Sequence, residues 1–160
     1  MRKRFDLKIA SPNGYKAMLG LSSHVRNCGL DGALLELVKI RISQINGCAF
    51  CIAMHVVDAR KLGVSDDRMH LLAAWREAPV YSQRERAALA WAEALATLPG
   101  GDVADSVFEE VRRHFSETEI ADLCFAIVEI GGWNRLMIAT RTPPELAMVS
   151  DAHVSGMSRD

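Results

Sequence analysis

The sequence has few aromatic residues and no long uninterrupted hydrophobic run. Phe, Trp and Tyr make up 6% of the 160 residues, and no alternating run of β-branched or aromatic residues is long enough to build a sheet. The most apolar segment, residues 123–139, is interrupted by Glu129, Asn134 and Arg135, which argues against a membrane span. Neither a Gly-x-Gly-x-x-Gly motif nor a phosphate-binding loop is present, so no nucleotide cofactor is implied.

The charges are nearly balanced. With 19 basic and 20 acidic residues the net charge is −1, so nothing predicts binding to nucleic acid or to an anionic membrane. The opening MRKRFDLKIASPNG is basic but lacks the apolar segment of a secretory signal. We therefore expect a cytoplasmic protein. In that reducing compartment a close cysteine pair such as Cys48 and Cys51 indicates redox or metal chemistry rather than a structural disulfide.

Most of the structural signals in the sequence are those of α-helices. The length fits a single domain spanning 1–160 with a core over about 12–148, and helix start and stop signals predict an all-α fold of about six to seven helices. Glycine, proline and capping residues place these helices near 14–27, 32–44, 48–62, 65–78, 102–114 and 118–140, with another after Ser82. Asp102 is the expected N-cap of the 102–114 helix, Gly131-Gly132 offers a kink in the last one, and 1–11 and 150–160 are expected to fray.

Three residues with chemically reactive side chains share one face of the helix predicted at 48–62. At about 100° per residue, Cys48, Cys51 and His55 fall on one narrow stripe, which is otherwise apolar. Residues three apart on a helix have Cα atoms about 5 Å apart, a separation that a disulfide accepts. His55 lies one turn beyond Cys51 and can take its proton. The helix N-terminus lowers a thiol pKa and burial raises it, so the net direction stays open.

Glu36 is harder to assign from its pattern. Most apolar residues of its helix fall on the opposite side, so periodicity predicts a solvated Glu36 paired with Lys39. Ile40 on the same side as Glu36 indicates instead that another helix or subunit covers this face.

The arrangement Glu-x11-Cys-x2-Cys-x3-His, set in ELVKIRISQINGCAFCIAMHVVDARKLG, resembles the AhpD-like alkylhydroperoxidase branch of the carboxymuconolactone decarboxylase family. The later segment IVEIGGWNRLMIATRTPPE is similar to the helix of that branch that carries a Trp-Asn-Arg run. The resemblance implies a helical fold that assembles as a homo-oligomer, a trimer or hexamer. It also implies an enzyme that reduces hydroperoxides in antioxidant defence, or a disulfide reductase, without metal, flavin or nicotinamide.

The resemblance also implies roles for individual residues. Cys51 would attack the hydroperoxide and become a sulfenic acid, and Cys48 would resolve it to a disulfide that a dithiol or lipoyl-type partner reopens. His55 and Glu36 would form the proton relay. Phe50 stands where the best-studied peroxidases of this branch have a further histidine, so this relay has one member fewer.

Other functions remain open at this stage. Cys48, Cys51 and His55 could supply three zinc ligands, with Glu36 or a distant residue as the fourth. The pair could instead be packing residues in a decarboxylase-type enzyme or in a binding scaffold.

Two helical regions carry weaker indications of oligomerisation and of further residues near the site. Apolar residues on more than one side of 32–62 and 118–140 favour oligomerisation. Trp133, Asn134 and Arg135 are expected to pack near the site or at a subunit contact, on the resemblance alone.

Overall fold

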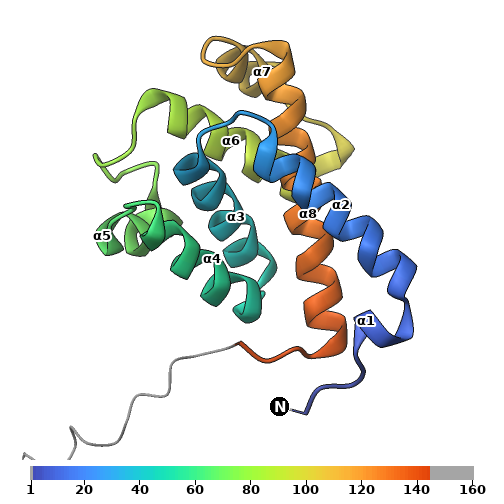
Figure 1. Cartoon of the computed structure of the whole chain (residues 1–160). Coiled ribbons are helices and arrows are strands. Elements are labelled where there is room, and N and C mark those ends of the chain that lie inside the picture. The colour runs from blue at the N-terminus through green and yellow to red at the C-terminus, as the bar shows by residue number, and fades with distance from the viewer. Residues whose placement is uncertain (1, 145–160) are drawn as a thin grey trace, which may run out of the picture.

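The computed structural model describes residues 2–144, and within that range it contains helices and no strands (Figure 1). The predicted all-α fold is confirmed. The helices are α1 (Leu7–Ala10), α2 (Pro12–Asn27), α3 (Gly32–Asn46), α4 (Ala49–Lys61), α5 (Asp66–His70), α6 (Gln83–Thr97), α7 (Asp105–Arg112) and α8 (Glu117–Thr140), with short 3-10 turns η1 (Leu71–Ala74) and η2 (Pro99–Gly101).

Capping residues set the ends of the long helices as the sequence predicts. The Asp31 carboxylate accepts a hydrogen bond from the backbone N–H of Leu34 at 2.8 Å and so starts α3. Gly47, with φ 69°, ends α3 in the left-handed conformation that glycine adopts without strain. Ser82 with Glu85 and Ser116 with Glu119 form the two predicted capping boxes, at the starts of α6 and α8.

The structure corrects four local expectations. Residues 7–10 form the short helix α1, capped by Asp6, although the whole segment 1–11 was expected to fray. Residues 65–78 hold only α5 and η1 rather than one helix. Asp102 is not the N-cap of the following helix, because α7 starts after Ala104. The Gly131-Gly132 pair does not interrupt α8, which runs as one helix from Glu117 to Thr140.

Helix α3 is the centre of the fold. It packs against α4, α6 and α8, and α2 lies along the outer side of α8 (Figure 1). Apolar residues of α3, α6, α7 and α8 form one core cluster, and residues of α3, η1 and α6 form a second one beside it. The predicted core over 12–148 runs past residue 144, so its last four positions lie outside the described residues.

Helix α8 is the longest element. Its 24 residues reach a mean hydropathy of 1.2 over an 18-residue window, which meets the length and composition of a membrane span. Half of that window is buried inside the protein, where α8 packs against α2, α3 and α6. Its apolar composition is therefore explained by its place in the core.

Candidate functional site

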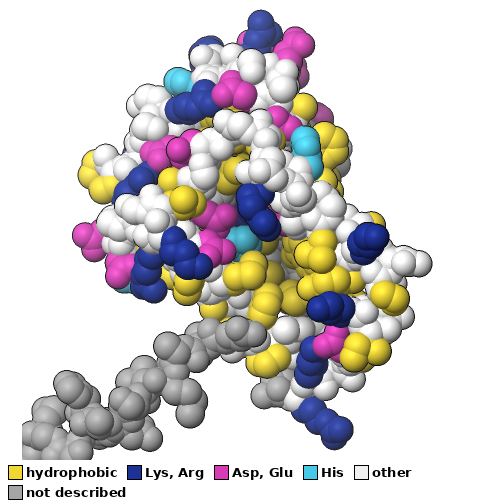
Figure 2. Space-filling view, viewed as in Figure 1, with side chains coloured by type: hydrophobic (Ala, Val, Ile, Leu, Met, Phe, Trp, Pro, Cys, Tyr) yellow, Lys and Arg dark blue, Asp and Glu magenta, His cyan; other side chains and the backbone are white. Residues whose placement is uncertain are grey.

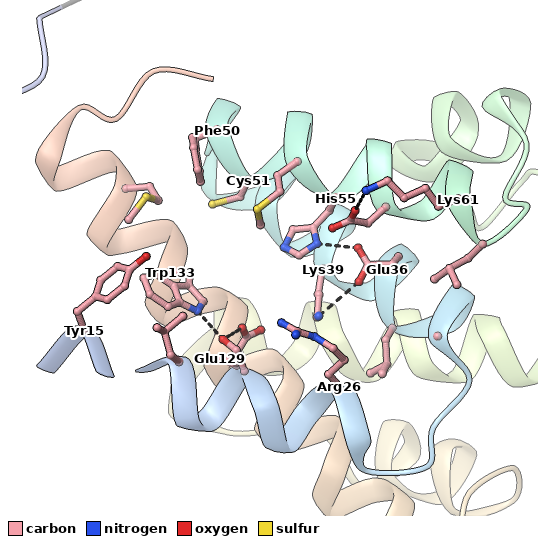
Figure 3. Close-up of a pocket in the computed structure, with 18 residues that line it drawn as sticks. Tyr15, Arg26, Glu36, Lys39, Phe50, Cys51, His55, Lys61, Glu129 and Trp133 are labelled. Carbon is pink, nitrogen blue, oxygen red and sulfur yellow. Dashed lines mark hydrogen bonds and ion pairs between the residues drawn. The ribbon is translucent and has the colours of Figure 1, made fainter. Parts of the chain in front are cut away.

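Helices α2, α3, α4 and α8 surround a cavity of about 650 Å³ (Figure 3). Cys51 and His55 from α4 and Glu36 from α3 line it, so three of the four predicted site residues meet in one place. Apolar side chains of Leu19, Leu35, Met54 and Met137 form much of the remaining wall. Around this hollow the surface carries hydrophobic side chains next to charges of both signs (Figure 2).

Cys48 is the N-cap of α4, and the predicted helix start at residue 48 is therefore one residue early. Its Sγ accepts a hydrogen bond from the backbone N–H of Cys51 at 3.4 Å. Each cysteine is 1% exposed, but only Cys51 lines the cavity. The two thiols thus differ in access: Cys51 faces the space where a ligand would sit, and Cys48 lies behind it.

The two thiols also differ in acidity. The pKa of Cys48 is lowered to about 7, chiefly because the Cys51 thiol donates a hydrogen bond to it, with further donors from the Cys51 backbone and Asn134. The pKa of Cys51 is raised, because its proton is held by Cys48 and because it is buried. The sequence left the direction of the thiol pKa open, and the two thiols differ: the pKa of Cys48 is lowered and that of Cys51 is raised, so the pair loses its first proton near neutral pH.

Glu36 and His55 form a buried pair. Glu36 Oε2 lies 2.6 Å from His55 Nδ1, and its other oxygen accepts a hydrogen bond from Lys39 Nζ at 3.4 Å (Figure 3). A carboxylate only accepts hydrogen bonds, so the imidazole proton lies on Nδ1 and Nε2 keeps a free lone pair. Since Glu36 is 8% exposed, the solvated position that periodicity predicts is wrong. The covering that Ile40 indicated is present, because α4 packs over this face.

No hydrogen bond joins the Cys51 thiol to the His55 imidazole within residues 2–144, although both side chains line the cavity. A proton passing between them therefore needs a bridging water or a substrate oxygen.

Asn134 joins α8 to the end of α3 behind the cysteines. Its amide donates to Ser43 Oγ at 2.9 Å and accepts from Asn46 Nδ2 at 2.9 Å. Its side chain also lowers the pKa of Cys48 by hydrogen bonding. The expectation that Asn134 packs near the site is thus met, although its link to the thiols could not be read from the sequence.

Glu129 and Trp133 form the wall opposite α4. Trp133 Nε1 donates to Ser22 Oγ at 2.9 Å, and the Ser22 hydroxyl donates to Glu129 Oε1 at 2.5 Å (Figure 3). Sequence reasoning missed both Glu129 and Ser22. A signal for Glu129 was available, because an acidic residue inside an apolar helical run is seldom buried without a reason.

One group of side chains could hold a metal ion. Ligand atoms of Glu36, His55 and Asp58 lie within 4.8 Å of one another. Lys39 already contacts Glu36, and Lys61 Nζ lies 2.7 Å from Asp58, so two ammonium groups supply positive charge there. No cysteine belongs to such a group in the described part of the chain, so the zinc ligand set considered from the sequence is not assembled.

Comparison with known proteins identifies the family. The model of the carboxymuconolactone decarboxylase family matches residues 12–94. The uncharacterized protein YdfG of Bacillus subtilis (strain 168) is 40% identical over 139 residues, which are 87% of this chain and 95% of YdfG. The chain belongs to the carboxymuconolactone decarboxylase family.

Solved structures place this family member within the AhpD-like fold. A protein of unknown function from Agrobacterium tumefaciens, described as a putative antioxidant defence protein AhpD, superposes with a TM-score of 0.88 at 38% identity, over 91% of this chain and 100% of that one. An uncharacterized peroxidase-related protein from Ralstonia eutropha JMP134, described as an alkylhydroperoxidase AhpD core, superposes with a TM-score of 0.75 at 20% identity over 86% and 73%. The second likeness shows the fold alone.

Proposed function

We propose that the protein is a cytoplasmic thiol peroxidase that reduces hydroperoxides through Cys51 and Cys48, with His55 and Glu36 as its proton relay. The observation that carries the proposal is that Cys51 and the Glu36–His55 pair line the same cavity, while Cys48 lies directly behind Cys51. A nucleophile, a base and a group that orients the base are thus arranged around one space.

The first step forms the thiolate. The cysteine pair loses a proton near pH 7, and His55 Nε2, whose lone pair is free, takes it through a bridging water. The remaining proton lies between the two sulfurs. When it moves from Cys51 to Cys48, the negative charge rests on the sulfur that faces the cavity.

The oxidation steps then follow in order. Cys51 S⁻ attacks the terminal oxygen of R–O–O–H, the O–O bond breaks, and the leaving alkoxide takes the proton from His55 to become R–OH. Cys48 attacks the sulfur of the Cys51 sulfenic acid, and the hydroxyl leaves with the Cys48 proton as water. The sum is two thiols and R–O–O–H giving a disulfide, R–OH and water. A dithiol or lipoyl-type partner reopens the disulfide by exchange.

The side chain of Phe50 lies against this cavity and supplies no proton. The Glu36–His55 pair therefore forms the relay of the proposed mechanism without a further histidine. Oligomerisation as a trimer or hexamer is part of the same proposal, and the half-exposed Phe125 and Val128 on α8 offer an apolar surface for it.

The proposal is tested by thiol titration and intact mass before and after one equivalent of cumene hydroperoxide, with zinc content measured on the same sample. The expected result is the loss of two thiols and two mass units, mapped to a Cys48–Cys51 peptide and reversed by a dithiol. Cys48→Ser should instead stop at a Cys51 sulfenic acid that dimedone traps. Unchanged thiols in the wild-type protein would contradict the redox function, and stoichiometric zinc bound by the cysteines would replace it with a metal site.

A further inference from the structure

Glu129 is a buried carboxylate that the proposed mechanism does not use. It is 4% exposed and lines the cavity from α8, facing the α4 wall that carries Cys51 and His55 (Figure 3). Acidic side chains are rarely buried to this degree unless a cation or several donors satisfy them. Within residues 2–144 the recorded partner of the Glu129 carboxylate is the Ser22 hydroxyl rather than a cation.

Only one of the two carboxylate oxygens of Glu129 has a hydrogen-bond partner among the described residues. Ser22 has a single hydroxyl hydrogen, and because Ser22 Oγ already accepts from Trp133, that hydrogen is directed to Glu129 Oε1. Glu129 Oε2 is shielded from solvent and has no partner. The Trp133–Ser22 chain therefore fixes one oxygen and leaves an unused acceptor at the edge of the cavity. Since the terminal torsion of glutamate is soft, a small rotation presents that acceptor to a ligand.

A ligand that satisfies this acceptor must bring a hydrogen-bond donor into a largely apolar cavity. It must also place its reacting atom at Cys51, which lines the same cavity as Glu129. In R–O–O–H the oxygen attacked by sulfur is the one that carries the hydrogen. The two requirements therefore meet on a single O–H group.

We propose that Glu129 is the substrate-binding carboxylate of this cavity, accepting a hydrogen bond from the terminal O–H of an organic hydroperoxide while Cys51 attacks the same oxygen. This inference rests on the proposed function. The hydrogen bond persists through the step, because the attacked oxygen keeps its hydrogen when it becomes the Cys51 sulfenic acid. Glu129 neither gains nor loses a proton. It selects oxidants with a donor on the attacked atom, and the apolar wall accepts their organic group.

The test compares two oxidants in single-turnover stopped flow on the fully reduced protein. Cumene hydroperoxide carries the O–H donor, and 4,4′-dithiodipyridine is a neutral disulfide without a donor on the attacked sulfur. Glu129→Leu should slow oxidation by cumene hydroperoxide about 10- to 100-fold, the effect of losing one hydrogen bond to a charged group. It should leave the disulfide rate unchanged or raise it, because removing the negative charge lowers the pKa of Cys51. Glu129→Gln, which keeps an acceptor oxygen, should lie between Glu129→Leu and the wild type.

Two further variants guard against a structural explanation. Glu109→Gln, an exposed carboxylate on α7, should change neither rate. Asp122 is another buried carboxylate on α8 but does not line the cavity, so Asp122→Asn should keep the hydroperoxide rate within about 2-fold, a change smaller than one lost hydrogen bond causes.

The outcomes separate the two proposals. Equal slowing by both oxidants in the Glu129 variants would overturn the inference, as would an unchanged hydroperoxide rate or a loss in Asp122→Asn as large as in Glu129→Leu. In each of these cases the wild-type protein would still lose two thiols, so the peroxidase function would stand. A wild-type protein that does not react with cumene hydroperoxide would overturn both.

Discussion

Glu36 and His55 come from two different helices and meet at 2.6 Å in the buried wall of the cavity. Glu36 holds the imidazole proton on Nδ1, and the free Nε2 can then take a proton from the cavity side. Because Lys39 contacts the other oxygen of Glu36, the orientation of this side chain is fixed from both sides. The base of the proposed mechanism is thus oriented before substrate arrives.

Removing this orientation should slow the reaction. Glu36→Gln keeps the size of the side chain but can present an N–H to His55, which favours the tautomer with the proton on Nε2. The rate of thiol oxidation by cumene hydroperoxide should fall by about 100-fold or more, the usual contribution of a positioned acid or base. Stopped-flow kinetics measures it, with Glu109→Gln as the control; an unchanged rate would remove Glu36 from the relay.

The acidity of the cysteine pair can be read directly. Thiolate absorbance at 240 nm should rise with a midpoint near pH 7, the pKa of Cys48. In Cys51→Ala the midpoint should move upward toward the ordinary cysteine value, because the thiol that donates to Cys48 is lost. A midpoint that stays near pH 7 in that variant would mean that the Cys51 thiol is not the main cause.

Asn134 should matter for both stability and acidity. Asn134→Leu leaves the buried Ser43 hydroxyl and the Asn46 amide without their partner, so the free energy of unfolding should fall by about 1–3 kcal/mol. It should also raise the pKa of Cys48, which Asn134 stabilises as a thiolate. Urea unfolding and the thiolate titration measure the two effects. The neighbouring exposed residue serves as the control, since Arg135→Ala should change the unfolding free energy by less than about 0.5 kcal/mol; equal losses in both variants would contradict the role of Asn134.

The lowered pKa of Glu93 predicts how the free energy of unfolding depends on pH. Burial raises its pKa, but hydrogen bonds from Trp75, Arg41 and Arg76 outweigh burial, and the net pKa is lowered. A carboxyl group with a lowered pKa stabilises the folded state above its unfolded pKa of about 4.3 and loses that contribution as pH falls through the folded value.

The matching measurement is urea unfolding of the wild type and Glu93→Gln at a series of pH values. The wild type should be more stable by about 1–3 kcal/mol near neutral pH, and this difference should shrink as the pH falls from about 5 toward 3. A difference that does not change with pH would show that Glu93 acts through its shape rather than its charge.

The sequence predicted most of what depends on local signals. Glycine and capping residues located the long helices, as Asp31 and Gly47 show for α3. The sequence did not predict the short helix α1 or the change from α5 to the 3-10 turn η1, because segments this short show little periodicity. The stripe of Cys51 and His55 was predictable because both lie on one helix.

The rest of the site depends on how helices pack. Glu36 is buried because α4 covers a side of α3 that looks polar, and the pattern of α3 alone cannot reveal its neighbour. The hydrogen bonds from Trp133 to Ser22 and from Ser22 to Glu129 join α8 to α2, and Trp133 and Ser22 are 111 residues apart in the sequence. No spacing rule within one element anticipates such a contact.

Helix α8 also limits how this protein can vary in length. Glu129, Trp133 and Asn134 lie within six positions of one uninterrupted helix whose other sides form the core. One residue inserted before Glu129 would turn all three by about 100° relative to the helix start and carry them away from the cavity and the cysteines. Substitutions along α8 can be tested one at a time, whereas a change in its number of residues would displace the binding wall, the support of the cysteines and the core together.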